Sequence, residues 1–220
     1  SFKWQPILLN GSDLVLQREL YCQLSIHGKM VQAGQFMPYV ELLPLGTLLD
    51  KCLIESIHNK KLLERNFEPI AVNLTFQSMG DPEFHQWLNK FLRSSPLRER
   101  ICFDIPEAAV YSAPESCEAL CAVIRDNGSH FGIDHFGRQF GSMSYLQNLR
   151  PSYVKLDQSF AYYDESEHSS ELCRALINVA KGLDIEVIVT GIEENEQLKR
   201  FVPLKTNAYM GYISPPTPVE

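Results

Sequence analysis

Residues 69–75 read PIAVNLT, and the same pattern, a short apolar run ending in polar side chains, returns further along the chain. The later runs are RICFDIPE (100–107), HFGIDHFG (130–137), SYVKLD (152–157) and EVIVTGIEE (186–194). Short continuous apolar runs are typical of strands buried on both faces. Amphipathic stretches separate most of them, and this strand–helix alternation predicts an α/β fold with a largely parallel sheet.

Polar side chains stand at or just after the ends of these apolar runs. They are Asn73, Glu107, Asp134, Lys155 and Glu193. In a β/α barrel the carboxyl ends of successive strands meet at one face, and that face carries the functional site. The sequence therefore predicts a barrel with polar site residues gathered at one mouth.

The beginning of the chain follows a different pattern. WQPILL (4–9) and LVLQRELYCQL (14–24) flank the turn sequence NGSD, which predicts an antiparallel hairpin. Residues 33–64 have helical spacing with a break at 44–46, where Pro and Gly occur together. A hairpin followed by a helix-rich segment therefore precedes the regular alternation.

Length favours one domain that spans residues 1–220. A chain of 220 residues is somewhat shorter than a full eight-unit barrel, which typically runs to about 250 residues. The chain begins close to a strand and without Met, so we expect a domain excised from a larger multidomain protein. No apolar run approaches the roughly 18 residues of a membrane span. We expect a cytoplasmic domain, and a membrane-anchored parent protein stays open.

Composition argues against direct nucleic-acid binding. The net charge is −7, whereas such binding needs Lys and Arg to neutralise phosphates. The six cysteines include no C-x-x-C pair, and most lie in apolar segments. We therefore expect reduced, buried thiols rather than a metal cluster.

A series of motifs, in order along the chain, resembles the EAL-domain family of cyclic di-GMP phosphodiesterases. WQPI resembles its QPI strand, ELYCQL the signature E-A-L-x-R with Glu19 at the Glu, and AVNLT the VNLS strand. FDIPE resembles E-x-T-E, GIDHFG resembles LDDFG, YVKLDQSF resembles KIDxSF, VTGIEE resembles AEGVET, and MGY resembles QGY. The resemblance covers nearly the whole chain. It implies a modified TIM (β/α)8-like barrel with one antiparallel strand near the N-terminus.

The resemblance also implies a metal-dependent phosphodiesterase site. Two Mg²⁺ or Mn²⁺ ions about 4 Å apart can activate water and stabilise the charge that develops on a phosphodiester. Such hard ions prefer oxygen ligands. The positions that match the family motifs are Glu19, Asn73, Glu107 and Asp134 as metal ligands, Lys155 beside the attacking water and Glu193 as a second acid.

Several positions depart from the family pattern. The second Asp of DDFG is His135, and imidazole is a poor substitute for a carboxylate that bridges two Mg²⁺ ions, although it can bind Mn²⁺ or Zn²⁺. The first Glu of EGVE is Thr190, and the Gln of QGY is Met210. The Arg of E-A-L-x-R is Gln23, which lacks the guanidinium fork that grips a phosphate. These changes predict that efficient hydrolysis is lost.

The same residues also have purely structural interpretations. Asn73, Glu107 and Asp134 can be hydrogen-bonded remnants at a barrel mouth. Lys155 can form an ion pair with Asp134 or Asp157, and His135 is expected on the opposite face from Asp134 if the strand continues. An exposed aromatic face in the helical segment, at Phe36, Met37 and Tyr39, is a candidate partner surface.

We expect a degenerate EAL domain that acts as a non-catalytic regulatory module through a protein partner. The resemblance favours the CsrD/MshH type, which controls turnover of regulatory RNA. One alternative is a LapD-type receptor that binds cyclic di-GMP without hydrolysis, with Gln5, Gln23 and Tyr212 as nucleotide contacts. Another is a weak metal-dependent phosphodiesterase. No cofactor is required for the first interpretation, while a single Mg²⁺, Mn²⁺ or Ca²⁺ ion at a residual site and a homodimer stay open.

Overall fold

The computed structural model describes residues 1–65, 67–139, 141–162 and 167–219. Within these ranges eight strands close into a barrel, in the order β1, β2, β4, β5, β6, β7, β8, β9 and back to β1. Strand β1 runs antiparallel to both of its barrel neighbours, while the remaining barrel pairs are parallel. The predicted barrel with one antiparallel strand near the N-terminus is confirmed. The strands are β1 (Phe2–Leu9), β2 (Val15–Ile26), β4 (Ile70–Asn73), β5 (Ile101–Pro106), β6 (His130–Phe136), β7 (Tyr153–Leu156), β8 (Glu186–Val189) and β9 (Ala208–Tyr209).

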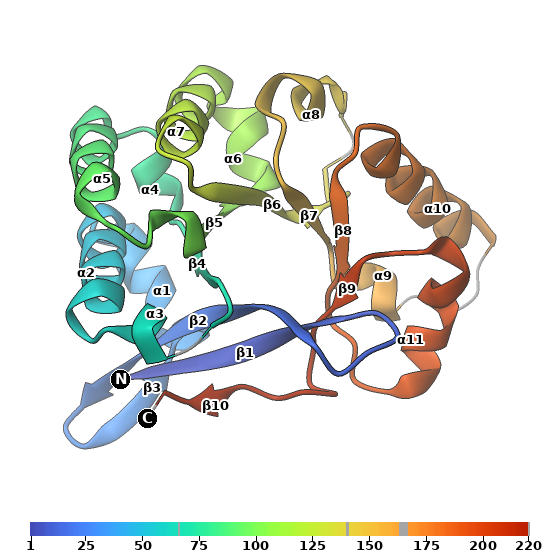
Figure 1. Ribbon diagram of the computed structural model, residues 1–220, viewed down its shortest axis with the longest axis horizontal. Helices are drawn as coiled ribbons and strands as arrows, with labels where there is room; N and C mark the ends of the chain where they lie inside the picture. Colours follow the sequence, from blue (N-terminus) through green and yellow to red (C-terminus); the bar gives the residue numbers. More distant parts are fainter. Residues whose placement is uncertain (66, 140, 163–166, 220) are drawn as a thin grey trace.

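Two short strands extend the barrel sheet. Strand β3 (Lys29–Gln32) forms a hairpin with β2, in the stretch between the predicted N-terminal hairpin and the predicted helical segment. Strand β10 (Thr217–Pro218) pairs with β1, and both chain ends lie side by side (Figure 1). The Pro-rich end of the chain therefore stays attached to the sheet through β1. Strand β9 covers only Leu8 and Leu9 of β1, which leaves the beginning of β1 available for the chain end.

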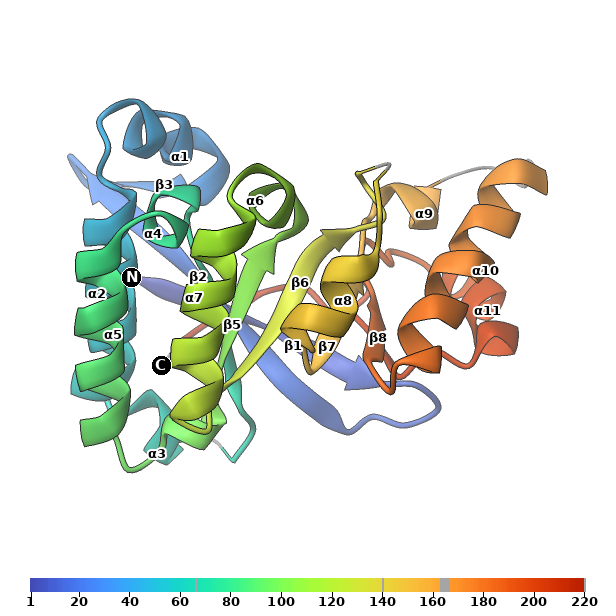
Figure 2. The same cartoon turned by 90° about the horizontal axis from the view of Figure 1, so that it is seen from above.

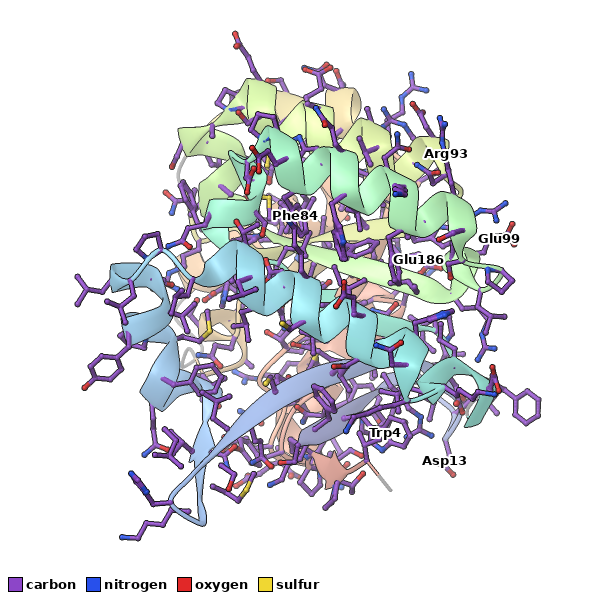
Figure 3. All side chains as sticks on the ribbon, turned by 90° about the vertical axis from the view of Figure 1, so that its left-hand side faces the viewer. Trp4, Asp13, Phe84, Arg93, Glu99 and Glu186 are labelled. Carbon is purple, nitrogen blue, oxygen red and sulfur yellow. The ribbon has the colours of Figure 1, made fainter. Side chains whose placement is uncertain are left out.

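Helices α2, α5, α7, α8 and α10 surround the parallel part of the barrel (Figure 1). Helix α5 begins at a capped N-terminus, where the Asp81 side chain accepts hydrogen bonds from the backbone N–H groups of Glu83 and Phe84. Phe84 lies under this helix, whereas Arg93 lies at its periphery (Figure 3). The helices are α1 (Ala33–Leu42), α2 (Gly46–Asn59), α3 (Leu62–Arg65), α4 (Phe76–Met79), α5 (Pro82–Ser94), α6 (Glu107–Ser112), α7 (Pro114–Asp126), α8 (Ser144–Leu149), α9 (Ser159–Tyr162), α10 (Glu167–Gly182) and α11 (Asn195–Phe201). Among the helices of the described residues, none combines the length and the hydropathy of a membrane-spanning segment.

Alternation along each strand divides the core into two layers. Side chains such as Val72, Phe103 and Val154 pack outward against the helices. The opposite face fills the barrel interior with a smaller apolar cluster of Ile7, Ala71, Cys102, Tyr153, Ile188, Ala208 and Met210. The interior is therefore packed with side chains, and polar residues of the same parity lie above this cluster.

A buried carboxylate joins α2 to the turn after β4. Asp50 is 1% exposed, and its Oδ2 accepts hydrogen bonds from Thr75 N at 2.8 Å, Thr75 Oγ1 at 2.8 Å and Ser78 Oγ at 2.7 Å. Burial raises the pKa of Asp50 to about 6, although these hydrogen bonds favour the charged form. Helix α2 is thus attached to the segment that directly follows Asn73.

We predict that Gly132→Ala destabilises the barrel. A Cβ at this position in β6 would lie 2.0 Å from Cε2 of the buried Tyr153 ring. Overpacking of this kind lowers the free energy of unfolding by about 1–3 kcal/mol. Urea denaturation measures the loss, with Gly182→Ala as the control, since a Cβ there meets nothing within 4 Å. Equal stability of the two variants would contradict the packing described here.

We predict a pH-dependent stability contribution from Asp50. Its pKa is about 6 in the folded protein and about 4 in an unfolded chain, so the folded state binds more protons between these values. The contribution is largest below about pH 4 and falls as pH rises to about 6. Urea denaturation at several pH values should show the advantage of the wild type over Asp50→Asn shrinking as pH rises. A constant difference would refute the assignment.

Candidate functional site

Lys155 lies at the centre of a polar cluster inside the barrel. Its Nζ donates a hydrogen bond to Oε2 of Glu19 at 2.6 Å and another to Oδ2 of Asp104 at 2.5 Å. The three residues come from β7, β2 and β5, and their exposed fractions are 1%, 5% and 0%. An unpaired charge would be costly at this depth, so the cation and the two carboxylates stabilise one another. The expected partners of Lys155, Asp134 or Asp157, are replaced here by Glu19 and Asp104.

Two further donors complete the cluster. Asn73 Nδ2 donates to Oε1 of Glu19 at 2.6 Å, and the hydroxyl of Tyr153 donates to Oδ1 of Asp104 at 2.7 Å. Each of the four carboxylate oxygens therefore accepts a hydrogen bond from a side chain. Such saturation fixes the positions of Glu19 and Asp104.

The pKa values of the cluster follow from burial and from the charges within it. Burial opposes the charge of Glu19, but Lys155 outweighs it and holds the pKa of Glu19 below its usual value. Burial likewise opposes the charge of Lys155, but Asp104 and Glu19 raise its pKa well above the usual value. Burial raises the pKa of Asp104 to about 7, reinforced by Glu19 and Asp134 and opposed by Lys155. Lys155 and Glu19 therefore stay charged at neutral pH, and Asp104 takes up a proton most readily.

Sequence reasoning did not identify Asp104 as a site residue. Two signals in the strand pattern point to it: Asp104 has the same parity as the interior residue Cys102, and it stands opposite Asn73 in the register of β4 and β5. The sequence predicted Glu107, just after the end of the strand, as the site carboxylate of this segment. The register shows that the carboxylate facing Lys155 comes from within the strand.

Glu107 lies at the start of α6 and binds the loop after β6. Its Oε1 accepts hydrogen bonds from Gly137 N at 3.3 Å and from the Tyr145 hydroxyl at 2.7 Å, and its Oε2 accepts one from Gln139 N at 2.9 Å. The side chain is 1% exposed. This geometry anchors the loop, and a role of Glu107 as a metal ligand stays a prediction.

His135 lies beside Asp134 at the end of β6. Its Nδ1 is 2.9 Å from Oδ2 of Asp157, and its Nε2 is 3.7 Å from Oδ2 of Asp134. The expectation that His135 lies on the opposite face is wrong, because its φ of 57° interrupts the alternation of the strand. The imidazole thus occupies the space between two carboxylates.

The other positions that depart from the family motifs also have defined contacts. The Thr190 hydroxyl donates to the backbone carbonyl of Leu156 at 2.8 Å. Met210 is 6% exposed and belongs to the apolar cluster inside the barrel. Glu193 is exposed and accepts a hydrogen bond from the Tyr162 hydroxyl at 2.8 Å, so the structure does not bring it into contact with Lys155.

The predicted nucleotide contacts divide into buried and exposed residues. Gln5 is 6% exposed, and its Nε2 donates to the carbonyls of Gly211 at 2.7 Å and Ser214 at 3.0 Å. Gln23 is equally buried, and its Nε2 donates to Oε1 of Gln32 at 2.7 Å. Tyr212 is 72% exposed. The two amides thus form hydrogen bonds within the protein, whereas the ring of Tyr212 is accessible to solvent.

The cluster contains the ligand types that a hard divalent ion prefers. Glu19, Asp104 and Asp134 offer carboxylate oxygens, and Asn73 offers an amide oxygen. However, Lys155 contacts two of these carboxylates, and Asn73 turns its amide nitrogen toward Glu19. Over the described ranges no group of three His, Cys, Asp or Glu side chains is placed to hold an ion together. The donor set fits one ion only if Lys155 withdraws from its carboxylates.

We predict that Lys155→Met lowers the free energy of unfolding by about 3–5 kcal/mol, because it leaves two buried carboxylates without their cation. Adding Glu19→Gln and Asp104→Asn should recover much of the loss, because neutral amides carry no charge that needs a buried cation and do not repel each other. Urea denaturation of the single and triple variants measures both effects. A loss from Lys155→Met alone that the two amides fail to reduce would show that the ion pairs are not its cause.

Comparison with known proteins identifies relatives that are longer than this chain and match it along most of its length. The model of the EAL domain family matches residues 1–216. The chain is 28% identical over 216 residues to the cyclic di-GMP phosphodiesterase RocR of Pseudomonas aeruginosa, covering 96% of this chain and 55% of RocR. It is 24% identical over 179 residues to the probable cyclic di-GMP phosphodiesterase PdeG of Escherichia coli, covering 78% of this chain and 35% of PdeG.

A solved structure extends the likeness to three dimensions. The S helix-GGDEF-EAL region of Vibrio cholerae LapD superposes with a TM-score of 0.92 at 26% identity, over 97% of this chain and 52% of that chain. LapD has been solved both without ligand and bound to c-di-GMP. The chain thus spans only part of these relatives. Because the family model matches almost its whole length, the chain belongs to the EAL domain family.

Proposed function

We propose that the chain is a catalytically degenerate EAL domain that serves as a non-hydrolysing signalling module. The observation that carries the proposal is the set of contacts made by three side chains that differ from the family motifs. His135 binds Asp157, the Thr190 hydroxyl donates to a carbonyl, and Met210 is packed in the apolar interior. Two-metal hydrolysis needs oxygen ligands for both ions. None of these three side chains supplies a carboxylate.

Lys155 strengthens this proposal. In a hydrolytic site it would stand beside the attacking water, but here its ammonium group contacts Glu19 and Asp104. An ion that used these carboxylates would have to displace a cation from a site of low dielectric. We infer that a residual Mg²⁺, Mn²⁺ or Ca²⁺ ion binds weakly, if the cluster admits one, and that the module needs no cofactor.

A protein partner is the first proposed means of signalling, as in CsrD/MshH-type regulators. The candidate surface of α1 is supported in part: Tyr39 is 65% exposed, whereas Phe36 is 5% exposed and belongs to the core. Leu42 and Leu43, at the end of the same helix, are 77% and 58% exposed. Clustered exposed apolar residues are typical of interaction surfaces. The net charge of −7 favours a protein over a nucleic acid as the partner.

Cyclic di-GMP is the second proposed ligand, bound without hydrolysis. The likeness to LapD favours this candidate, since LapD has been solved in complex with the dinucleotide. The accessible ring of Tyr212 offers a surface for base stacking next to the turn that Gln5 holds. Weak metal-dependent hydrolysis is the remaining alternative and would require His135 as a metal ligand.

We predict that the purified domain does not linearise cyclic di-GMP at a rate comparable to that of RocR from Pseudomonas aeruginosa. Loss of one catalytic group typically lowers a rate by about 10²–10⁴-fold, and more than one is altered here. The measurement is chromatographic detection of the linear product in Mg²⁺ and, separately, in Mn²⁺. Turnover within tenfold of RocR would sink the proposal.

Calorimetric titration with cyclic di-GMP separates the two signalling modes. The titration is run in Ca²⁺, which suppresses hydrolysis, and again in EDTA. Heat of binding without turnover supports the receptor, and the variant Tyr212→Ala should then weaken binding. Absence of binding in both buffers leaves the protein-partner mode.

A further inference from the structure

Gln77 joins the end of α1 to the beginning of α2. Its Oε1 accepts a hydrogen bond from Gly46 N at 2.6 Å, and its Nε2 donates one to the carbonyl of Glu41 at 3.0 Å. Gln77 itself lies on the short helix α4, which directly follows the turn after β4. One side chain of the barrel mouth therefore holds both sides of the α1–α2 connection.

Asp50 makes a second attachment, one turn further along α2. Its Oδ2 accepts the hydrogen bonds from Thr75 and Ser78 described above, and all of these groups are buried. Between the two attachments the helix contacts the turn closely. A Cβ added at Gly46 would lie 2.5 Å from Thr75 Oγ1 and 2.8 Å from Gln77 Oε1. We call the contacts of Gln77 and Asp50 with these partners the α2–α4 clamp.

The α2–α4 clamp ends two residues from the Lys155 cluster. Thr75 follows Leu74, whose backbone N–H donates to the carbonyl of Asp104 at 3.0 Å. Leu74 follows Asn73, whose Nδ2 donates to Glu19 at 2.6 Å. A displacement of the turn would thus act on Asn73 through the chain and on Asp104 through a hydrogen bond. Both residues belong to the polar cluster around Lys155.

The other end of the clamp lies at the surface. Leu42, Leu43, Leu45 and Leu48 flank the α1–α2 connection and are 77%, 58%, 42% and 58% exposed. Helices α1 and α4 lie at the same end of the barrel as α6 and α9 (Figure 2). The connection is therefore exposed to solvent while it is attached, through Gln77 and Asp50, to the interior polar cluster.

We propose that the α2–α4 clamp is a positioning device, with Gln77 and Asp50 as positioning residues, which sets the place of Asn73 at the barrel mouth. Movement of the α1–α2 connection then changes ligand binding at the mouth. The effect on ligand binding rests on the proposed function, because it takes cyclic di-GMP as the ligand. The positioning of Asn73 concerns the free protein.

Two variants disturb the clamp in opposite ways. Gly46→Ala inserts a methyl group between α2 and Thr75, and Gln77→Ala removes the bridge without adding atoms. Gly34→Ala is the matched control, because it makes the same glycine change on α1 where a Cβ meets nothing within 4 Å. Should the wedge variant fail to fold, the truncation of Gln77 still decides the question.

The first readout is the side-chain amide resonance of Asn73 in ¹⁵N NMR spectra of the free protein. We expect it to shift in both clamp variants and to stay in place in Gly34→Ala. The Asn127 side-chain amide, which donates to Asn89 at 2.9 Å, serves as an internal reference for general loosening. An unmoved Asn73 resonance in a folded clamp variant, or equal shifts at Asn73 and Asn127, would overturn the proposal.

The second readout is calorimetric titration with cyclic di-GMP in Ca²⁺. Coupling of ordinary strength predicts that both clamp variants lose about fivefold or more in affinity, whereas the control retains it. Unchanged affinity in a variant whose Asn73 resonance has moved would refute the link to ligand binding. A wild-type domain that binds no cyclic di-GMP would refute the ligand, and the NMR result would still decide whether the clamp positions Asn73.

Discussion

The buried ammonium group of Lys155, held between Glu19 and Asp104, is the interaction on which the rest of the barrel mouth depends. It brings together three strands that are far apart in the sequence, with hydrogen bonds of 2.6 and 2.5 Å. Because the charges lie out of reach of water, each needs the others. Asn73 and Tyr153 satisfy the remaining carboxylate oxygens. The cluster therefore has a complete set of partners before any ligand binds.

The full set of hydrogen bonds on Glu19 and Asp104 supports the proposed loss of cyclic di-GMP hydrolysis. Family members that hydrolyse cyclic di-GMP are expected to direct their carboxylates at metal ions, whereas here two carboxylates face a lysine. His135 stands between Asp134 and Asp157, where a further carboxylate is expected from the motif. The barrel is thus kept, with a TM-score of 0.92 to LapD, and we propose that its mouth serves ligand binding or partner contacts instead of hydrolysis. The α2–α4 clamp is the proposed route between those two uses.

Sequence patterns predicted the barrel because each buried strand is a short apolar run, and amphipathic stretches typical of helices separate most of these runs. The turn sequence between the first two apolar segments predicted the hairpin that contains the antiparallel strand. The strand β10 was missed, because its pairing depends on how much of β1 the two-residue strand β9 covers. The partners of Lys155 were missed for a related reason: they lie across the barrel, and only the register of neighbouring strands shows that Asp104 shares its level with Asn73. His135 could not be placed from alternation, since its positive φ breaks the strand pattern.

The most direct test of the central claim is ¹⁵N NMR of the Lys155 ammonium group, with the Lys155→Arg variant to assign its signal, during titration with Mg²⁺. A buried ammonium group held by two carboxylates exchanges its protons slowly, so its signal should be visible at neutral pH. The account predicts that this signal persists and does not move as Mg²⁺ is added. A saturable shift or loss of the signal would show that an ion displaces Lys155 from Glu19 and Asp104, and would contradict the account.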